Sequence, residues 1–181
     1  YDVKKLEELK ISINEHLKKY IYDNGYKNIE NIVIDNLNKE NLTLSTAESC
    51  TGGLIGHRLT QVSGSSAVYA GGVISYSNES KIDQLNVNPD NIKNFGAVSE
   101  QVAIEMAQNV REKFNSSIGV SVTGIAGPDG GSEAKPVGLV YVGYCDEKLS
   151  FVQKFNFSSN REDNKIRTSQ AVLKLILNNN Y

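Results

Sequence analysis

The hydrophobic residues of the first 41 positions recur at helical spacing. Between residues 3 and 21 they lie three or four positions apart among lysines and glutamates, which is the pattern of an amphipathic helix. A turn at Asn24 and Gly25 ends this helix, and the same spacing predicts a second helix before a connection at residues 38–41. The two apolar stripes consist of Leu6, Leu9, Ile13 and Leu17, and of Ile29, Ile32, Val33 and Leu37. We expect residues 1–41 to form a helical segment that leads into the main domain.

Beyond residue 42, short apolar runs alternate with stretches of helical spacing. The runs predict strands at residues 42–47, 67–76, 118–123, 138–145 and 149–157. Helices are predicted at residues 54–59, 78–85, 99–110 and 162–177. The pair Gly71 and Gly72 indicates a bulge in the second strand, and Ser99 can cap the helix that follows it. The expected buried stripes are Val102, Met106 and Val110, and Ile166, Leu173, Ile176 and Leu177.

This alternation defines the expected fold class. Strands that are separated by helices favour a sheet covered on both faces, and the last two strands are close enough in sequence to form an antiparallel hairpin. We therefore predict an α/β fold, a three-layer α/β/α sandwich with a mixed sheet at residues 42–181, preceded by N-terminal linker helices. A chain of 181 residues suits one such domain with an appendage.

The composition excludes several classes of protein. Hydrophobic residues make up 39% and charged residues 22%, with a net charge of -2, so neither disorder nor direct nucleic-acid binding is expected. No run of about 18 apolar residues and no secretory signal occurs, which predicts no membrane span and a cytoplasmic location. Cys50 and Cys145 lack the spacing of a disulfide framework or a zinc site. The chain begins at Tyr1 without a methionine, so we expect it to derive from a longer polypeptide.

The first candidate motif is Thr-Ala-Glu-Ser-Cys-Thr-Gly-Gly at residues 46–53, where a predicted strand turns into a helix. Ser49 is exposed at such a junction, and the first N–H groups of the helix point at whatever binds beside it. These groups can stabilise an oxyanion or hold a phosphate. From the motif alone, an equal alternative is that Ser49 or Thr51 only caps the helix.

The second candidate motif supplies a base. A serine needs a base to become a nucleophile. Neither of the two histidines is the expected base, because His16 lies on an exposed helix face and His57 is more simply a surface or packing residue. Lys81 is the leading candidate, because burial can lower the pKa of a lysine from about 10.4 towards about 7 to 8. Tyr76, at the end of a predicted strand, could donate to the substrate or relay the proton. Taken alone, Lys81 is more simply a solvated helix lysine.

The third candidate motif is a glycine-rich loop at residues 123–131, which follows a strand and ends near Lys135. Glycine lets the backbone approach an anion and present N–H groups to it, although the loop matches neither a P-loop nor a dinucleotide fingerprint. Arg161 and Arg167, near the start of the last helix, could supply charge for a phosphate. The alternatives are a flexible loop and two solvated arginines.

In combination, these motifs resemble the C-terminal domain of the CinA family, the competence/damage-inducible proteins. The resemblance rests on residues 46–53, on Gly71-Gly72 with residues 76–81, on residues 96–100 and on residues 123–138, and it runs from about Leu42 to Leu177. It implies a nicotinamide mononucleotide deamidase that releases nicotinate mononucleotide and ammonia. It also implies no metal or other cofactor in this domain, a nucleotide as the small-molecule partner, and a homo-oligomer.

The resemblance also implies the site. Ser49 would be the nucleophile, with Tyr76 and Lys81 as its catalytic partners. The expected substrate-binding residues are Glu48, Cys50, Thr51, Gly52, Gly53, Thr123, Gly124, Ala126, Gly127, Arg161 and Arg167. Residues 1–41 resemble the helices that link this domain to a further N-terminal domain in many family members. The alternative hypothesis is a non-catalytic nucleotide-binding or competence-related regulatory module, which would bind nucleotide without releasing ammonia.

Overall fold

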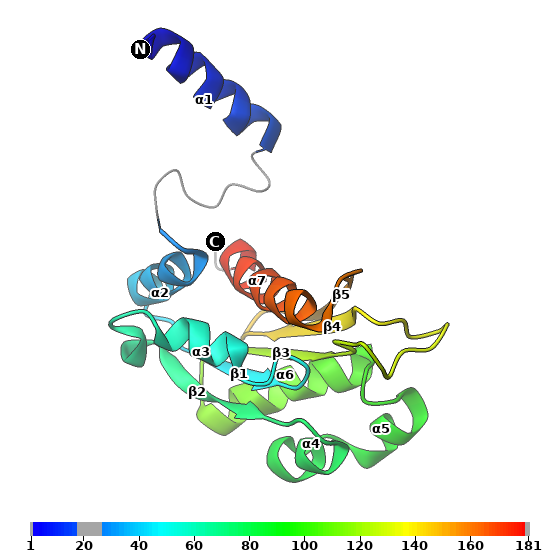
Figure 1. The fold of residues 1–181 in the computed structure, drawn as a ribbon. Coiled ribbons are helices and arrows are strands. Elements are labelled where there is room, and N and C mark those ends of the chain that lie inside the picture. The colour runs from blue at the N-terminus through cyan, green and yellow to red at the C-terminus, as the bar shows by residue number, and fades with distance from the viewer. Residues whose placement is uncertain (1, 18–26, 180–181) are drawn as a thin grey trace.

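One open, mixed sheet of five strands forms the centre of the protein (Figure 1). The computed structural model describes residues 2–17 and 27–179. The strands are β1 (Leu44–Glu48), β2 (Tyr69–Ile74), β3 (Ile118–Gly124), β4 (Leu139–Cys145) and β5 (Ser150–Asn156). Their spatial order is β2-β1-β3-β4-β5, with β1, β2 and β3 parallel and the last two strands antiparallel. The predicted mixed sheet and its C-terminal hairpin are confirmed.

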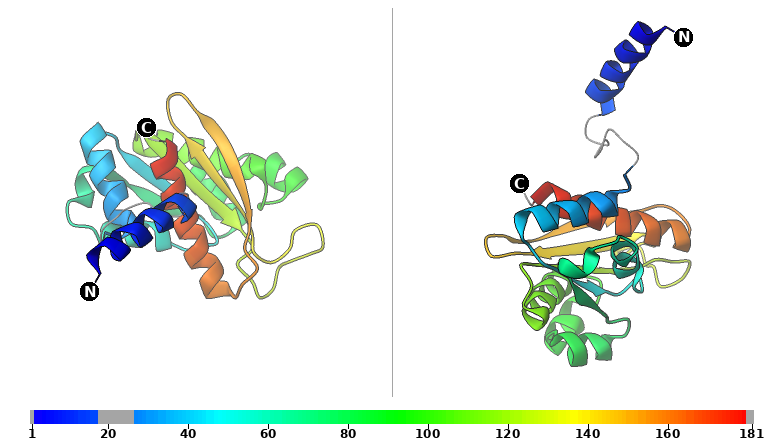
Figure 2. Two further views of the ribbon diagram at one scale, coloured as in Figure 1. Left: turned by 90° about the horizontal axis from the view of Figure 1, so that it is seen from above. Right: turned by 90° about the vertical axis from the view of Figure 1, so that its left-hand side faces the viewer.

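Helices cover both faces of this sheet (Figures 1 and 2). The helices are α1 (Val3–Leu17), α2 (Ile29–Glu40), α3 (Leu54–Thr60), α4 (Asn78–Leu85), α5 (Pro89–Phe95), α6 (Glu100–Phe114) and α7 (Arg161–Asn179). Helices α2, α3 and α7 lie on one face, whereas α6 packs on the other face beside α4 and α5. The three-layer sandwich is therefore confirmed, and none of the described helices has both the length and the apolar composition of a membrane span.

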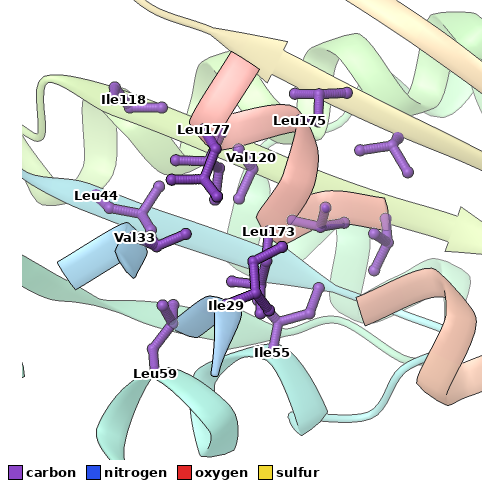
Figure 3. Packing of buried hydrophobic residues seen from close by; sticks show 14 of the residues in the cluster. Ile29, Val33, Leu44, Ile55, Leu59, Ile118, Val120, Leu173, Leu175 and Leu177 are labelled. Carbon is purple, nitrogen blue, oxygen red and sulfur yellow. The ribbon is translucent and has the colours of Figure 1, made fainter. Parts of the chain in front are cut away.

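Each face of the sheet has its own hydrophobic core. The larger core joins β1, β3 and β4 to α2, α3 and α7, with Val33, Leu59 and Leu173 fully buried at its centre (Figure 3). The smaller core joins the opposite face to α6 through Val102, Met106 and Val110, as the sequence predicts. Burying each such side chain contributes about 1.5–3 kcal/mol, so the two cores fix the sheet between its helices.

The last helix departs from its predicted stripe. Leu173, Ile176 and Leu177 are buried, but Ile166 is 49% exposed, so its assignment to the buried side of the helix was wrong. The N-terminal part of α7 lies beside Leu54, at the start of α3, where Ile166 lines an open groove. Asn164 and Thr168, in the same turns, are buried, so Ile166 lies on the outer face of a helix that is packed along its length.

The two N-terminal helices differ in their packing. Ile29, Val33 and Leu37 of α2 are buried in the larger core, so α2 is part of the packed body. The apolar residues of α1, among them Leu6 and Leu9, are exposed. The predicted turn at residues 24–25, and the end of the first helix near residue 21, lie outside the described residues.

The topology places the carboxyl ends of three strands together. The chain leaves β1 through α3 to reach β2 on one side, and returns through α4–α6 to β3 on the other side. Such a reversal of strand order creates a crevice at the carboxyl ends of the strands, where ligands bind in open α/β sheets. The predicted bulge in β2 is present, because the pairing with β1 shifts from Tyr69 to Gly71. The residues that follow β1, β2 and β3 along the chain therefore enter the site.

Candidate active site

Ser49 lies directly after β1, in a tight turn that leads into α3. Its backbone N–H donates to the Val122 carbonyl of β3 at 3.1 Å, and its carbonyl accepts from the Gly52 N–H at 3.0 Å. Gly52 and Gly53 adopt positive φ values of 62° and 96°, which glycine reaches without a Cβ clash. The two glycines therefore let the chain reverse direction while Ser49 stays anchored to the sheet.

The buried carboxylate of Glu48 holds this turn in shape. It accepts hydrogen bonds from the Thr51 hydroxyl at 2.6 Å and from the N–H groups of Gly53, Ile55 and Gly56 at 3.0, 3.1 and 2.8 Å. Glu48 is only 2% exposed, so its charge is balanced by these donors rather than by water. The Glu48 carboxylate and the Thr51 hydroxyl are thus engaged within the turn, which leaves the Thr51 backbone N–H as the group of these two residues that can face a substrate.

Lys81 meets Ser49 from the opposite side of the turn. Its Nζ atom lies 3.0 Å from Ser49 Oγ and 2.8 Å from the Ser75 carbonyl, with the Tyr76 carbonyl at 3.4 Å. The residue is 1% exposed, although it belongs to the short helix α4. Ser77 caps this helix by accepting from the Ser80 N–H, which fixes the direction in which Lys81 leaves it.

Burial shifts the acid–base equilibrium of Lys81 towards the neutral amine. Loss of hydration is the largest influence, and it lowers the pKa of the Lys81 amine below its usual value. No carboxylate forms an ion pair with Lys81 in the described chain, and its nearest oxygen partners are a hydroxyl and backbone carbonyls. A neutral amine can accept the Ser49 proton, and the carbonyls then stabilise the ammonium that forms.

The Ser49–Lys81 pair opens into a cavity of about 270 Å³ at the carboxyl ends of β1, β2 and β3. Among the residues predicted for the site, nine line the cavity: Ser49, Cys50, Tyr76, Lys81, Thr123, Gly124, Ala126, Gly127 and Arg161. Glu48, Thr51, Gly52, Gly53 and Arg167 are not among the lining residues. The structure therefore brings together segments that lie up to 112 residues apart in the sequence (Ser49 to Arg161).

Arg161 and Tyr76 form one rim of the cavity. Arg161 Nη2 donates to the Tyr76 hydroxyl at 2.8 Å, and Nη1 donates to the Gly127 carbonyl at 2.8 Å. Arg167 lies six residues further along α7 and is exposed. Because six residues correspond to about one and two-thirds turns of a helix, the two arginines leave α7 in different directions. Arg161 is the arginine at the site.

The glycine-rich loop is tied down at several points along its length. Asn164 Nδ2 donates to the Ala126 carbonyl at 3.1 Å, and Thr123 Oγ1 donates to the Ala97 carbonyl at 2.7 Å. At the far end, Lys135 Nζ donates to the carbonyls of Phe95 and Val98 at 2.6 and 2.7 Å. Lys135 thus holds the loop to residues 95–98, which contribute the opposite wall of the cavity.

With this geometry established, comparison with known proteins identifies the family. The model of the CinA C-terminal domain matches residues 26–179. The chain belongs to the CinA family. A CinA-like protein of Cytophaga hutchinsonii is 44% identical over 178 residues, which cover 94% of this chain and 43% of that protein. A CinA-like protein of Kosmotoga olearia is 47% identical, covering 90% of this chain and 39% of that protein. The CinA domain described here thus spans less than half the length of these relatives.

Solved structures share the fold of this CinA domain. The competence/damage inducible protein CihA from Agrobacterium tumefaciens is 37% identical, with a TM-score of 0.80 over 84% of this chain and 94% of that one. A CinA superfamily protein from Klebsiella pneumoniae is 26% identical, with a TM-score of 0.81 over 84% of this chain and 95% of that one. The α/β sandwich is therefore a feature that this CinA domain shares with these proteins.

Two backbone N–H groups of the CinA site face no protein oxygen. Within the described residues, the N–H groups of Cys50 and Thr51 donate to no carbonyl, carboxylate or hydroxyl, and, against the larger effect of burial, both act on the Cys50 thiol to lower its pKa. They follow Ser49 directly, where a developing negative charge on a substrate oxygen would need donors. Burial raises the pKa of the neighbouring Cys50 thiol to about 12, so Cys50 lines the cavity as a neutral group rather than as a competing nucleophile.

Six lining residues of the CinA cavity were not predicted individually. They are Asn78, Ala97, Val98, Ile125, Asp129 and Gly130. Each falls inside one of the four motifs that carry the family resemblance, so position within a motif was the available signal. Asn78 adds an amide and Asp129 adds a carboxylate to the cavity wall. Together with the Arg161 guanidinium, they provide both hydrogen-bond donors and acceptors.

Proposed function

We propose that this CinA domain hydrolyses the carboxamide of nicotinamide mononucleotide to nicotinate mononucleotide and ammonia. The observation that carries the proposal is the 3.0 Å contact between Lys81 Nζ and Ser49 Oγ in a buried position that borders a cavity. A binding module has no need of an amine with a lowered pKa beside a hydroxyl. The identity of the substrate is inferred from the resemblance of the four motifs to the CinA family.

The first half-reaction forms an ester with Ser49. Neutral Lys81 takes the hydroxyl proton while Ser49 Oγ bonds to the carboxamide carbon, and the carbonyl oxygen becomes an oxyanion. The N–H groups of Cys50 and Thr51 donate to this oxyanion. The Lys81 ammonium then gives its proton to the amide nitrogen, the C–N bond breaks, and ammonia leaves.

The second half-reaction restores the enzyme. A water molecule enters the position that ammonia has left, loses a proton to Lys81 and attacks the ester carbon. The same N–H groups hold the second oxyanion. Its collapse breaks the bond to Ser49 Oγ, which takes the proton back from Lys81 and releases the carboxylic acid.

The rim of the cavity positions the nucleotide. The Tyr76 hydroxyl accepts a hydrogen bond from Arg161, so its own O–H can donate to a different acceptor. The amide oxygen or a ribose oxygen of the substrate can be that acceptor. Arg161 supplies donors for the ribose phosphate, and the N–H groups of the glycine-rich loop supply donors for the rest of the nucleotide. Binding energy from this remote part orients the carboxamide against Ser49.

A coupled ammonia assay on the purified chain tests the proposal. The panel would contain nicotinamide mononucleotide, its riboside, free nicotinamide and the dinucleotide, with calorimetric binding measured in parallel. We expect ammonia from the mononucleotide above the other three. Nucleotide binding without any ammonia would reject hydrolysis and support the alternative of a regulatory module.

The rate should depend on pH through Lys81. Only the neutral amine can accept a proton, so kcat/KM should rise with pH and level off above the pKa of Lys81. Because burial lowers this pKa, the midpoint should lie below the ordinary value of 10.5. Initial rates across the pH range check this, and a rate that falls as pH rises towards this midpoint would contradict a neutral lysine as the base.

A further inference from the structure

A second groove adjoins the Ser49 cavity. It has a volume of about 440 Å³ and is lined by Leu54, Arg161, Glu162, Lys165 and Ile166. Arg161 lines both this groove and the cavity, so the two spaces meet at its side chain. A ligand bound with its reacting group at Ser49 would reach the groove by passing the Arg161 side chain, which borders both spaces.

Lys165 brings a second cation to this boundary. It lies four residues after Arg161 on α7, so both side chains leave the same face of the helix. Lys165 Nζ is 3.9 Å from the position that a Cβ atom of Gly52 would occupy, which places it against the turn that carries Ser49. The described structure gives Lys165 neither a hydrogen bond nor an ion pair, although it is half-buried.

The rest of the groove suits an organic phosphate. Leu54 is half-buried and Ile166 is 49% exposed, and together they form an apolar wall beside the two cations. The Glu162 carboxylate also borders the groove, so the net charge of its three ionised side chains is only +1. This balance matches a single phosphate group attached to an apolar or sugar framework better than a highly charged polyphosphate.

We infer that Lys165 and Arg161 bind the 5′-phosphate of the nucleotide substrate, with Lys165 determining the requirement for that phosphate. The inference rests on the proposed function in placing the carboxamide at Ser49. Lys165 is a specificity-determining residue that makes no contact with the reacting atoms. Its loss should weaken the binding of phosphorylated ligands and leave their turnover at saturation nearly unchanged.

The test compares Lys165→Gln with Arg167→Gln as a matched control. Arg167 lies two residues away on the same helix, is exposed and lines neither space, and its replacement removes the same charge. Calorimetry would measure the Kd of nicotinate mononucleotide and of nicotinate riboside for each variant. Ammonia release would separate KM from kcat for the amidated mononucleotide.

For Lys165→Gln, we expect the Kd of the mononucleotide to rise by about 10- to 100-fold and that of the riboside to stay within about twofold, the loss typical of one charged hydrogen bond. KM should rise with little change in kcat, and Arg167→Gln should behave as the wild type. The inference would be overturned if Lys165→Gln weakened the binding of mononucleotide and riboside equally, or if Arg167→Gln had the same effect as Lys165→Gln. A wild-type protein that binds both ligands equally well would also overturn it. If no variant releases ammonia but the phosphate preference still depends on Lys165, the subsite stands and the proposed hydrolysis fails.

Discussion

Ser49→Ala should reduce ammonia release from nicotinamide mononucleotide by at least about 10³-fold in kcat, because the bond-forming oxygen is removed. Nucleotide binding should persist, since the cavity walls and Arg161 are unchanged. Steady-state ammonia assays at saturating substrate measure the loss. Ser66→Ala, at an exposed serine of the 3-10 helix that follows α3, serves as the matched control and should retain wild-type activity.

Lys81→Met should lower kcat by about 10²- to 10⁴-fold, the usual contribution of a positioned base. Methionine fills a similar volume without an amine, so the variant tests the chemistry more than the packing. Lys113→Met, on the exposed side of α6, controls for the loss of a charge. Full activity in Ser49→Ala or Lys81→Met, with a folded protein, would remove the mechanism.

Glu48→Ala should lower the free energy of unfolding by about 3 kcal/mol or more. It leaves the Thr51 hydroxyl and the N–H groups of Gly53, Ile55 and Gly56 without their acceptor, and each buried unsatisfied donor costs about 1–3 kcal/mol. Denaturant unfolding measures this loss. Because the same turn presents Ser49, kcat should fall as well.

Glu48→Gln separates the roles of shape and charge. It keeps one side-chain acceptor oxygen but points an amide donor at other donors, so we expect a smaller loss of stability and a reduced kcat with nearly unchanged KM. Glu112→Ala, an exposed glutamate of α6, is the control. A Glu48 variant with wild-type stability that has lost only nucleotide binding would instead support the direct substrate contact predicted from the sequence.

The sequence predicted the strands of the sheet and the places of Ser49 and Lys81 in the fold because these depend on local patterns. Strand and helix periodicity alone placed β1 before the turn at Ser49 and α4 at Lys81. The resemblance of the motifs to the CinA family implies that these two residues, 32 positions apart, act together, and in the structure Lys81 Nζ and Ser49 Oγ lie 3.0 Å apart.

The features that the sequence did not predict depend on how helices dock. The direction in which Arg161 and Arg167 leave α7 is set by the rotation of the helix against the sheet, which no local pattern encodes. The same rotation exposes Ile166. Helix α5 was not predicted, because Ile92 and Phe95 are its only large apolar residues, too few for a periodic stripe. The partners of Glu48 become visible only once the turn after β1 is closed.

The covalent ester on Ser49 can be tested directly with hydroxylamine as a competing nucleophile. If the ester forms and is then shared between water and hydroxylamine, the hydroxamate of nicotinate mononucleotide should appear at the expense of the acid. If loss of ammonia is the slow step, the summed rate of acid and hydroxamate formation should stay constant when hydroxylamine is added. Ser49→Ala should form neither product. Continued formation of the acid alone, or equal hydroxamate formation by Ser49→Ala, would contradict attack by Ser49 on the carboxamide.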